Sequence, residues 1–148
     1  MRTDLHSQNK ALIAPLRRAM YEFSAPGVRD ALAKVCGADT LFRLCHPFGD
    51  STGPEAYYNL AYRDLLVAWP DLERRDYIVL AGQDELSNDW VGCAGYYTGV
   101  FTAPWLEIPP TGHQVSMRFH EFYRIVAGKV VEVQALWDIP EVMLQARA

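Results

Sequence analysis

The chain has 148 residues and a formal net charge of −4, and half of its residues are hydrophobic while 12% are aromatic. This length suits one domain, which we expect to occupy residues 1–148 and to bury a sizeable core. Acids and bases are interspersed along the chain, so the charge pattern favours neither a nucleic acid nor an anionic membrane as a partner.

The cysteines and histidines give no sign of a metal site. Cys36, Cys45 and Cys93 are widely spaced without a CxxC pair, which argues against a disulfide framework and favours a reduced, cytoplasmic location. The four histidines lack HxxxH or HxH spacing, so we predict no metal and no other cofactor. No apolar run is long enough to span a bilayer or to serve as a signal segment.

Helical periodicity dominates the first half of the chain. Apolar residues three and four apart predict a helix over residues 9–23, with Pro15 in its first turn or at a kink. Ser24 is expected to cap a second helix that stops at Gly37. After a short strand over 41–48, Thr52 is expected to cap a third helix that ends before Pro70.

The pattern then changes from a period of 3.6 to a period of 2. Strands are predicted over 75–81 and 90–102, and glycines in the second strand indicate bends or bulges in a curved sheet: Gly92, Gly95 and Gly99. A proline-rich loop over 103–113 leads into a long hairpin over 114–139, with its turn at 127–129. Because the helices precede the strands, the fold class is α+β with a curved, mostly antiparallel sheet.

Two acids in this hairpin are candidates for chemistry. Alternation places Glu121 on an otherwise apolar strand face that also carries Phe119 and Tyr123. Asp138 and Glu121 lie at nearly the same number of residues from the turn, so continuous pairing of the two strands places them close together. Asp138 shares its strand face with Leu136. Two carboxylates in one apolar cavity repel each other, and one becomes a stronger base than in water, able to take a proton α to a carbonyl. The structural alternative is that Glu121 pairs with an arginine and Asp138 caps the tail.

Five segments in order along the chain resemble SnoaL-like polyketide cyclases of the nuclear transport factor 2-like superfamily. They are Gly53-Pro54-Glu55-Ala56, Ile108-Pro109-Pro110-Thr111-Gly112, Phe122-Tyr123-Arg124-Ile125, Gly128-Lys129-Val130-Val131-Glu132 and the terminal Asp138. The resemblance implies a cone-shaped α+β fold with the helices on the concave face of the sheet and a deep apolar pocket between them. It also implies that Asp138 is the acid/base of an intramolecular aldol closure without a cofactor, and that Glu121 stands where the cyclases carry a pocket histidine.

We therefore expect Asp138 and Glu121 to be catalytic in an enzyme that acts on a small apolar carbonyl compound, as a cyclase, isomerase or lyase. Residues expected to line the substrate pocket are His46, Tyr97, Tyr62, Phe119, Tyr123, Leu136 and Trp90. One alternative is a noncatalytic binder of an apolar small molecule. Another is a ketosteroid-isomerase-like or epoxide-hydrolase-like enzyme; epoxide hydrolysis would need an arginine in the pocket, for which Arg43 and Arg63 are candidates.

The outer face of the hairpin suggests a protein partner. Side chains expected there are Arg118, His120, Phe122 and Arg124 on the first strand, with Val131, Val133 and Trp137 on the second. Exposed tryptophan and valine in such numbers are typical of a protein–protein surface. We expect a symmetric homodimer through the sheets, which the resemblance also implies.

Overall fold

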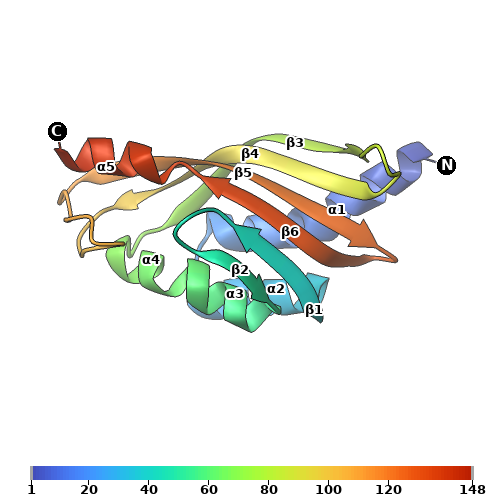
Figure 1. Cartoon of the computed structure of the whole chain (residues 1–148), viewed down its shortest axis with the longest axis horizontal. Coiled ribbons are helices and arrows are strands. Elements are labelled where there is room, and N and C mark those ends of the chain that lie inside the picture. The colour runs from blue at the N-terminus through green and yellow to red at the C-terminus, as the bar shows by residue number, and fades with distance from the viewer. Residues whose placement is uncertain (1, 148) are drawn as a thin grey trace.

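The computed structural model describes residues 2–147 (Figure 1). The helices are α1 (Arg2–Tyr21), α2 (Ala25–Val35), α3 (Pro54–Ala61), α4 (Arg63–Ala68) and α5 (Ile139–Arg147). The strands are β1 (Cys36–Leu44), β2 (Gly49–Thr52), β3 (Glu73–Gln83), β4 (Asp89–Val100), β5 (Gln114–Val126) and β6 (Lys129–Trp137). None of the described helices is long and apolar enough to cross a membrane.

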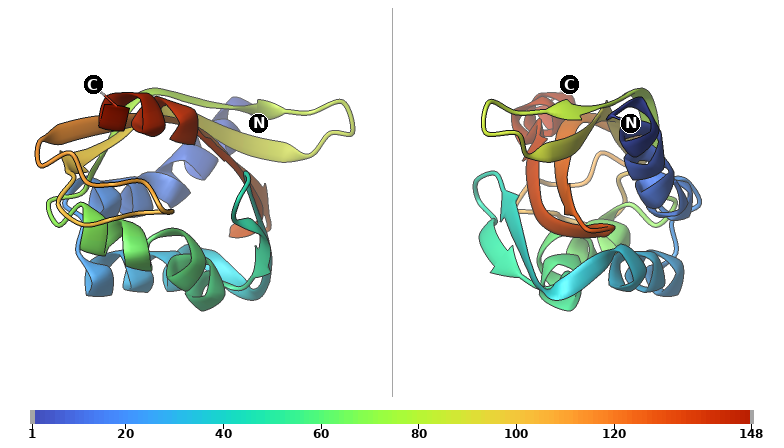
Figure 2. Two further views of the ribbon diagram at one scale, coloured as in Figure 1. Left: turned by 60° about the vertical axis from the view of Figure 1, so that its left-hand side comes forward. Right: turned by 90° about the vertical axis from the view of Figure 1, so that its right-hand side faces the viewer.

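The strands form one sheet in the order β2-β1-β6-β5-β4-β3, in which only the pairing of β1 with β6 is parallel. The sheet curls around the helices α1 to α4, while α5 lies at the end of β6 (Figures 1 and 2). This arrangement confirms the predicted α+β class, although β2 and the full length of α5 were not expected.

The helix boundaries follow local capping, with one exception. The Ser24 hydroxyl accepts a hydrogen bond of 3.1 Å from the backbone N–H of Gly27, as predicted for an N-cap. The cap predicted at Thr52 is wrong, because Thr52 ends β2 and the N-cap of α3 is Gly53, which makes no side-chain cap bond. Gly53 has a φ of 87°, a conformation that glycine adopts at little cost.

A bulge in β6 decides which side chains face the helices. Ile125 pairs with Val130 but Arg124 pairs with Glu132, so Val131 is an extra residue. One inserted residue reverses the side to which every later side chain points. Side chains that point inward beyond the bulge are Val133, Ala135 and Trp137, all buried. The prediction that Val133 and Trp137 lie on the outer face is therefore wrong.

A second bulge, in β3, requires a glycine on the neighbouring strand. Asp76 pairs with Gly95 and Ile78 with Ala94, so Tyr77 is the extra residue. A Cβ atom at Gly95 would lie 2.0 Å from the carbonyl oxygen of Arg75, closer than any two such atoms can come. Gly95 thus marks a bulge, as predicted, and the bulge turns Ile78 and Leu80, which follow it, to the outer face of β3.

Candidate functional site

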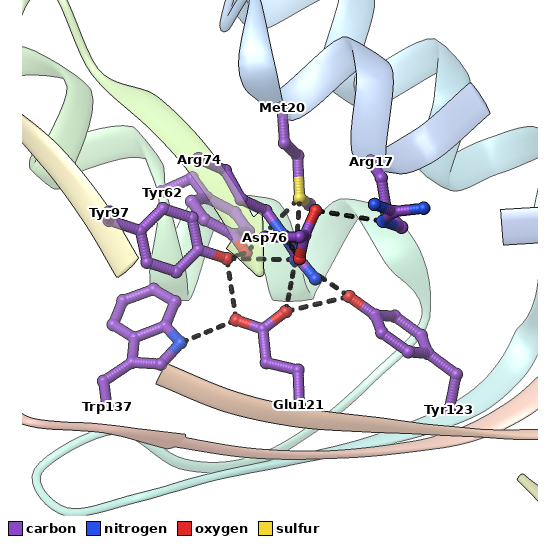
Figure 3. A network of polar contacts seen from close by, with 9 residues as sticks. All are labelled: Arg17, Met20, Tyr62, Arg74, Asp76, Tyr97, Glu121, Tyr123 and Trp137. Atoms are coloured by element: carbon purple, nitrogen blue, oxygen red, sulfur yellow. Dashed lines mark hydrogen bonds and ion pairs between the residues drawn. The ribbon is translucent and has the colours of Figure 1, made fainter. Parts of the chain in front are cut away.

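Glu121 of β5 lies fully buried between the sheet and the helices, where four donors surround its carboxylate (Figure 3). Oε1 accepts from Arg74 Nη1 at 2.5 Å and from the Tyr123 hydroxyl at 2.8 Å. Oε2 accepts from the Tyr97 hydroxyl at 2.7 Å and from Trp137 Nε1 at 2.9 Å. Because a carboxylate only accepts hydrogen bonds, this set of donors suits it at both oxygens.

The guanidinium of Arg74 is the counter-charge of Glu121. It is 1% exposed and stands 4.3 Å from the centre of the Phe119 ring. Burial alone would lower the pKa of Arg74, but Glu121, two tyrosines and Asp76 together hold that pKa well above its usual value. The charged form of the arginine is therefore stable in the interior.

Asp76 continues the series of charges toward the surface. Its Oδ1 accepts from Arg74 Nε at 3.1 Å, and its Oδ2 accepts from Arg17 Nε of α1 at 2.9 Å. The Asp76 side chain is 5% exposed and that of Arg17 is 29% exposed. Figure 3 shows the resulting order Glu121, Arg74, Asp76, Arg17, which joins β5 to β3 and β3 to α1.

Three tyrosine hydroxyls complete the polar interior. Burial raises the pKa of Tyr62, Tyr97 and Tyr123 well above the usual value, so all three remain protonated donors. Tyr97 gives its proton to Glu121, and the Tyr62 hydroxyl, 2.6 Å from that of Tyr97, is then the donor to Tyr97. The three hydroxyl protons are thus all directed to acceptors within the network, and they hold the Glu121 carboxylate in place.

The indole of Trp137 lies between Glu121 and the ring of Phe48. Its ring lies 5.2 Å from that of Tyr97 and 5.5 Å from that of Tyr62, with Phe48 at 5.6 Å. Beyond Phe48 is a hollow of about 500 Å³, here called the mouth. The mouth is lined by Pro47, Phe48, Leu60, Asp64, Val67, Pro104, Trp105 and Leu106. Two rings, Phe48 and Trp137, therefore lie between this hollow and Glu121.

Asp138 lies outside this interior, so the prediction that it points into the cone is wrong. Its side chain is exposed, and Oδ1 accepts from the backbone N–H of Glu141 at 3.3 Å, at the start of α5. The bulge in β6 is the cause, because it places Ala135 opposite Glu121 and turns Leu136 and Asp138 outward. The alternative in which Asp138 caps the tail matches this geometry.

Among the residues expected to line the pocket, four lie around Glu121 and three do not. Tyr62, Tyr97, Phe119 and Tyr123 are all buried in the interior. Leu136 is 61% exposed on the outer face, for the reason given for Asp138. Trp90 also faces outward, where its Nε1 donates to Asp84 at 2.8 Å. His46 is exposed on the loop that precedes Phe48.

The arginine of the interior was not among the candidates. Arg43 and Arg63 are exposed and pair with the surface acids Glu132 and Asp64. Arg74 lies just before the predicted strand over 75–81, because that prediction began two residues after the start of β3 at Glu73. Side chains two residues apart in a strand point to the same side of the sheet, so a strand that began earlier would have placed Arg74 on the face of Asp76.

Neither the two buried thiols nor a metal cluster among the described residues offers an alternative to this site. Burial raises the pKa of Cys36 to about 12 and that of Cys93 to about 11, so neither thiol ionises readily at neutral pH. Within residues 2–147, no three His, Cys, Asp or Glu side chains come together as metal ligands would. The charged interior around Glu121 is therefore the candidate site.

The family model of SnoaL-like polyketide cyclases matches residues 14–146, nearly the whole chain. The chain belongs to this SnoaL-like polyketide cyclase family. No curated protein sequence matches it.

Solved structures share the fold. A proposed SnoaL-like polyketide cyclase from Jannaschia sp. CCS1 is similar with a TM-score of 0.82 and 22% identity, over 100% of this chain and 97% of the other. IdmH, a proposed polyketide cyclase from Streptomyces antibioticus, has a TM-score of 0.75 and 20% identity, over 95% and 98%. AclR, a proposed hydroxylase from Streptomyces galilaeus, has a TM-score of 0.75 and 20% identity, over 96% and 86%. At these identities the likeness concerns the nuclear transport factor 2-like fold alone.

Proposed function

We propose that this chain is a cofactor-independent enzyme that moves a proton at the carbon α to a carbonyl group, with Glu121 as base and Arg74 as the donor to the carbonyl oxygen. One observation carries the proposal. Glu121 and Arg74 are both buried, and Nη2 of Arg74 has no hydrogen-bond partner among the described residues. A buried N–H without a partner is unfavourable, and a substrate oxygen would supply the missing acceptor.

The chemistry follows from the charges. One of the four hydrogen bonds to Glu121 opens as the substrate enters, and the α carbon gives its proton to the freed position of the carboxylate. The electron pair of that C–H bond forms an enolate whose oxygen is stabilised by Arg74. In a cyclase the enolate carbon attacks a second carbonyl of the same molecule, and a C–C bond forms. The new alkoxide then takes the proton back from Glu121, so the enzyme returns to its starting state without a cofactor.

A direct test is the exchange of α protons for deuterium in a small ketone such as 2-tetralone, followed by NMR in D₂O. Glu121→Gln is expected to slow the protein-catalysed exchange by about 10²–10⁴-fold, the usual contribution of a general base. Asp138→Asn is the matched control, and it should change the rate less than about 2-fold because Asp138 lies outside the interior. Unchanged exchange in Glu121→Gln, or its loss in Asp138→Asn, would contradict the proposal.

Epoxide hydrolysis is a second candidate, favoured by the position of Arg74 between two carboxylates. Arg74 contacts Glu121 through Nη1 and Asp76 through Nε. In such a reaction one carboxylate takes a proton from water as the water oxygen attacks an epoxide carbon and the C–O bond of the epoxide breaks. The opened oxygen then takes that proton back from the carboxylate, which gives a diol and restores the enzyme. Diol formation from styrene oxide without ketone exchange would favour this candidate, while neither activity would favour a noncatalytic binder.

We also propose that two copies of the chain form a symmetric dimer through the outer face of the sheet. Four apolar side chains are largely exposed there: Ile78 at 45%, Leu80 at 67%, Phe122 at 48% and Leu136 at 61%. Ile78, Leu80 and Phe122 also line an outer hollow of about 720 Å³ together with Trp90. Exposed apolar area of this kind favours association.

Light scattering at micromolar concentration is expected to give twice the mass of one chain. Leu80→Asp should shift the protein to monomer, because it places a charge in the apolar centre of the interface. Leu86→Asp is the matched control: Leu86 is 84% exposed but lies in the turn between β3 and β4, beside the hollow rather than in it. A wild-type chain that is monomeric, or a dimer that survives Leu80→Asp, would argue against this interface.

A further inference from the structure

Phe48 closes the mouth with a ring that is only half-buried. It lies at the end of the loop between β1 and β2, where its backbone N–H donates to the carbonyl of Cys45 at 2.9 Å. Its ring meets Trp137 edge-on at 5.6 Å and lies 6.2 Å from the ring of Trp105. The side chain of Phe48 thus fills the space between two indoles.

The two indoles are held far more firmly than Phe48. Trp137 is 2% exposed and bonded to Glu121, and Trp105 is 2% exposed with backbone hydrogen bonds to Ile108 in both directions. Phe48 is on an exposed loop, and His46 and Pro47 before it are exposed as well. A ligand entering at the mouth can move Phe48 at a much lower cost than either tryptophan.

We propose that Phe48 is a specificity-determining residue: its ring occupies a subsite for a flat apolar ring of the ligand, which must displace Phe48 to bind. The walls of the subsite are the edge of Trp137 and the ring of Trp105, geometry that suits another aromatic ring. The lining is otherwise apolar except for Asp64, so an anionic group is disfavoured at this end.

The inference deepens the proposed function, because a ring in this subsite lies against the indole that donates to Glu121. A ring held by Trp137 leaves the rest of the ligand free to extend toward the tyrosines and Arg74. Phe48 would then select ligands by the width of their leading ring: a narrow flat ring enters, and a bulky saturated one does not.

The test is binding of 2-naphthol, measured by titration calorimetry and by quenching of tryptophan fluorescence. Phe48→Ala is expected to bind 2-naphthol about 10-fold more tightly than wild type, because the ligand no longer has to displace a ring. Phe48→Trp should bind it more weakly than wild type, since a larger ring fills the subsite. Tyr77→Ala is the matched control: it removes a 58% exposed ring from β3 that lines neither the mouth nor the outer hollow, and it should leave the affinity unchanged.

Equal affinity in wild type and Phe48→Ala, or the same gain in Tyr77→Ala, would overturn the inference. Thermal unfolding of each variant checks the fold, and Phe48→Leu, which keeps part of the apolar volume, should give an intermediate affinity. The proposed chemistry fails separately. If 2-naphthol binds Phe48→Ala tightly while Glu121→Gln leaves ketone exchange unchanged, the subsite stands and the role of Glu121 falls.

Discussion

Replacing Arg74 by methionine is expected to lower the free energy of unfolding by about 3–5 kcal/mol, the usual effect of removing one partner of a buried ion pair. The change leaves the Glu121 carboxylate buried without its counter-charge. Methionine retains an unbranched apolar chain, so the loss reports the charge rather than the packing. Urea denaturation followed by circular dichroism measures the effect.

Two further variants isolate the cause. Arg43→Met removes one partner of the ion pair with Glu132, in which the Arg43 side chain is 52% exposed, and should change stability by less than about 1 kcal/mol. The double variant Arg74→Met with Glu121→Gln should recover a large part of the loss, because no buried charge remains while the amide oxygen still accepts from Tyr97. A single variant as stable as wild type would mean that the pair contributes little to the fold.

Gly95→Ala is expected to destabilise the protein by about 3 kcal/mol, at the upper end of the cost of forcing atoms into a filled space. The added methyl group would meet the backbone carbonyl of Arg75 at 2.0 Å, and backbone cannot rotate away as a side chain can. To accept the change, β3 must move away from β4. Since β3 carries Arg74, the variant should also weaken the near-ultraviolet circular dichroism of the buried tyrosines.

Gly82→Ala is the matched control, because Gly82 also lies in β3 but a Cβ there would meet nothing within 4 Å. That change should be neutral or stabilising by roughly 0.5 kcal/mol, as alanine restricts the unfolded chain more than glycine does. Equal stability of the two alanine variants would contradict this prediction. It would mean that the bulge in β3 can shift to make room for a methyl group and does not require Gly95.

The order and class of the elements could be predicted from the sequence because they depend on local periodicity. Glu121 was found in the same way, as an acid on an apolar strand face. The face of Asp138 could not be found, because it depends on one extra residue, Val131, between the turn and the end of β6. Nothing in the run of Val130 and Val131 distinguishes a bulge from continuous pairing, and the error reverses every later side chain.

The partner of Glu121 escaped prediction for a different reason. Arg74 and Glu121 are 47 residues apart, on strands separated in the sheet by β4. Alternation assigns a face to each strand but does not say which charges on that face meet across an intervening strand. In β4 the inward side chain beside them is Tyr97, whose hydroxyl bridges the space and was predicted only as a pocket residue.

The series of charges from Arg17 to Glu121 bears on how the chain folds as it is made. Arg17 and Asp76 are 59 residues apart, and Glu121 comes 45 positions after Asp76, so the contacts join the first, middle and last thirds of the chain. Contacts between such distant segments form slowly, because long loops must close first. Arg74 leaves the ribosome well before Glu121, and until β5 arrives it has only Asp76 as an acidic neighbour in this series. Helix α1 and β3 are synthesised before β5 and can pack together first. Glu121 joins Arg74 only when the hairpin of β5 and β6 has formed.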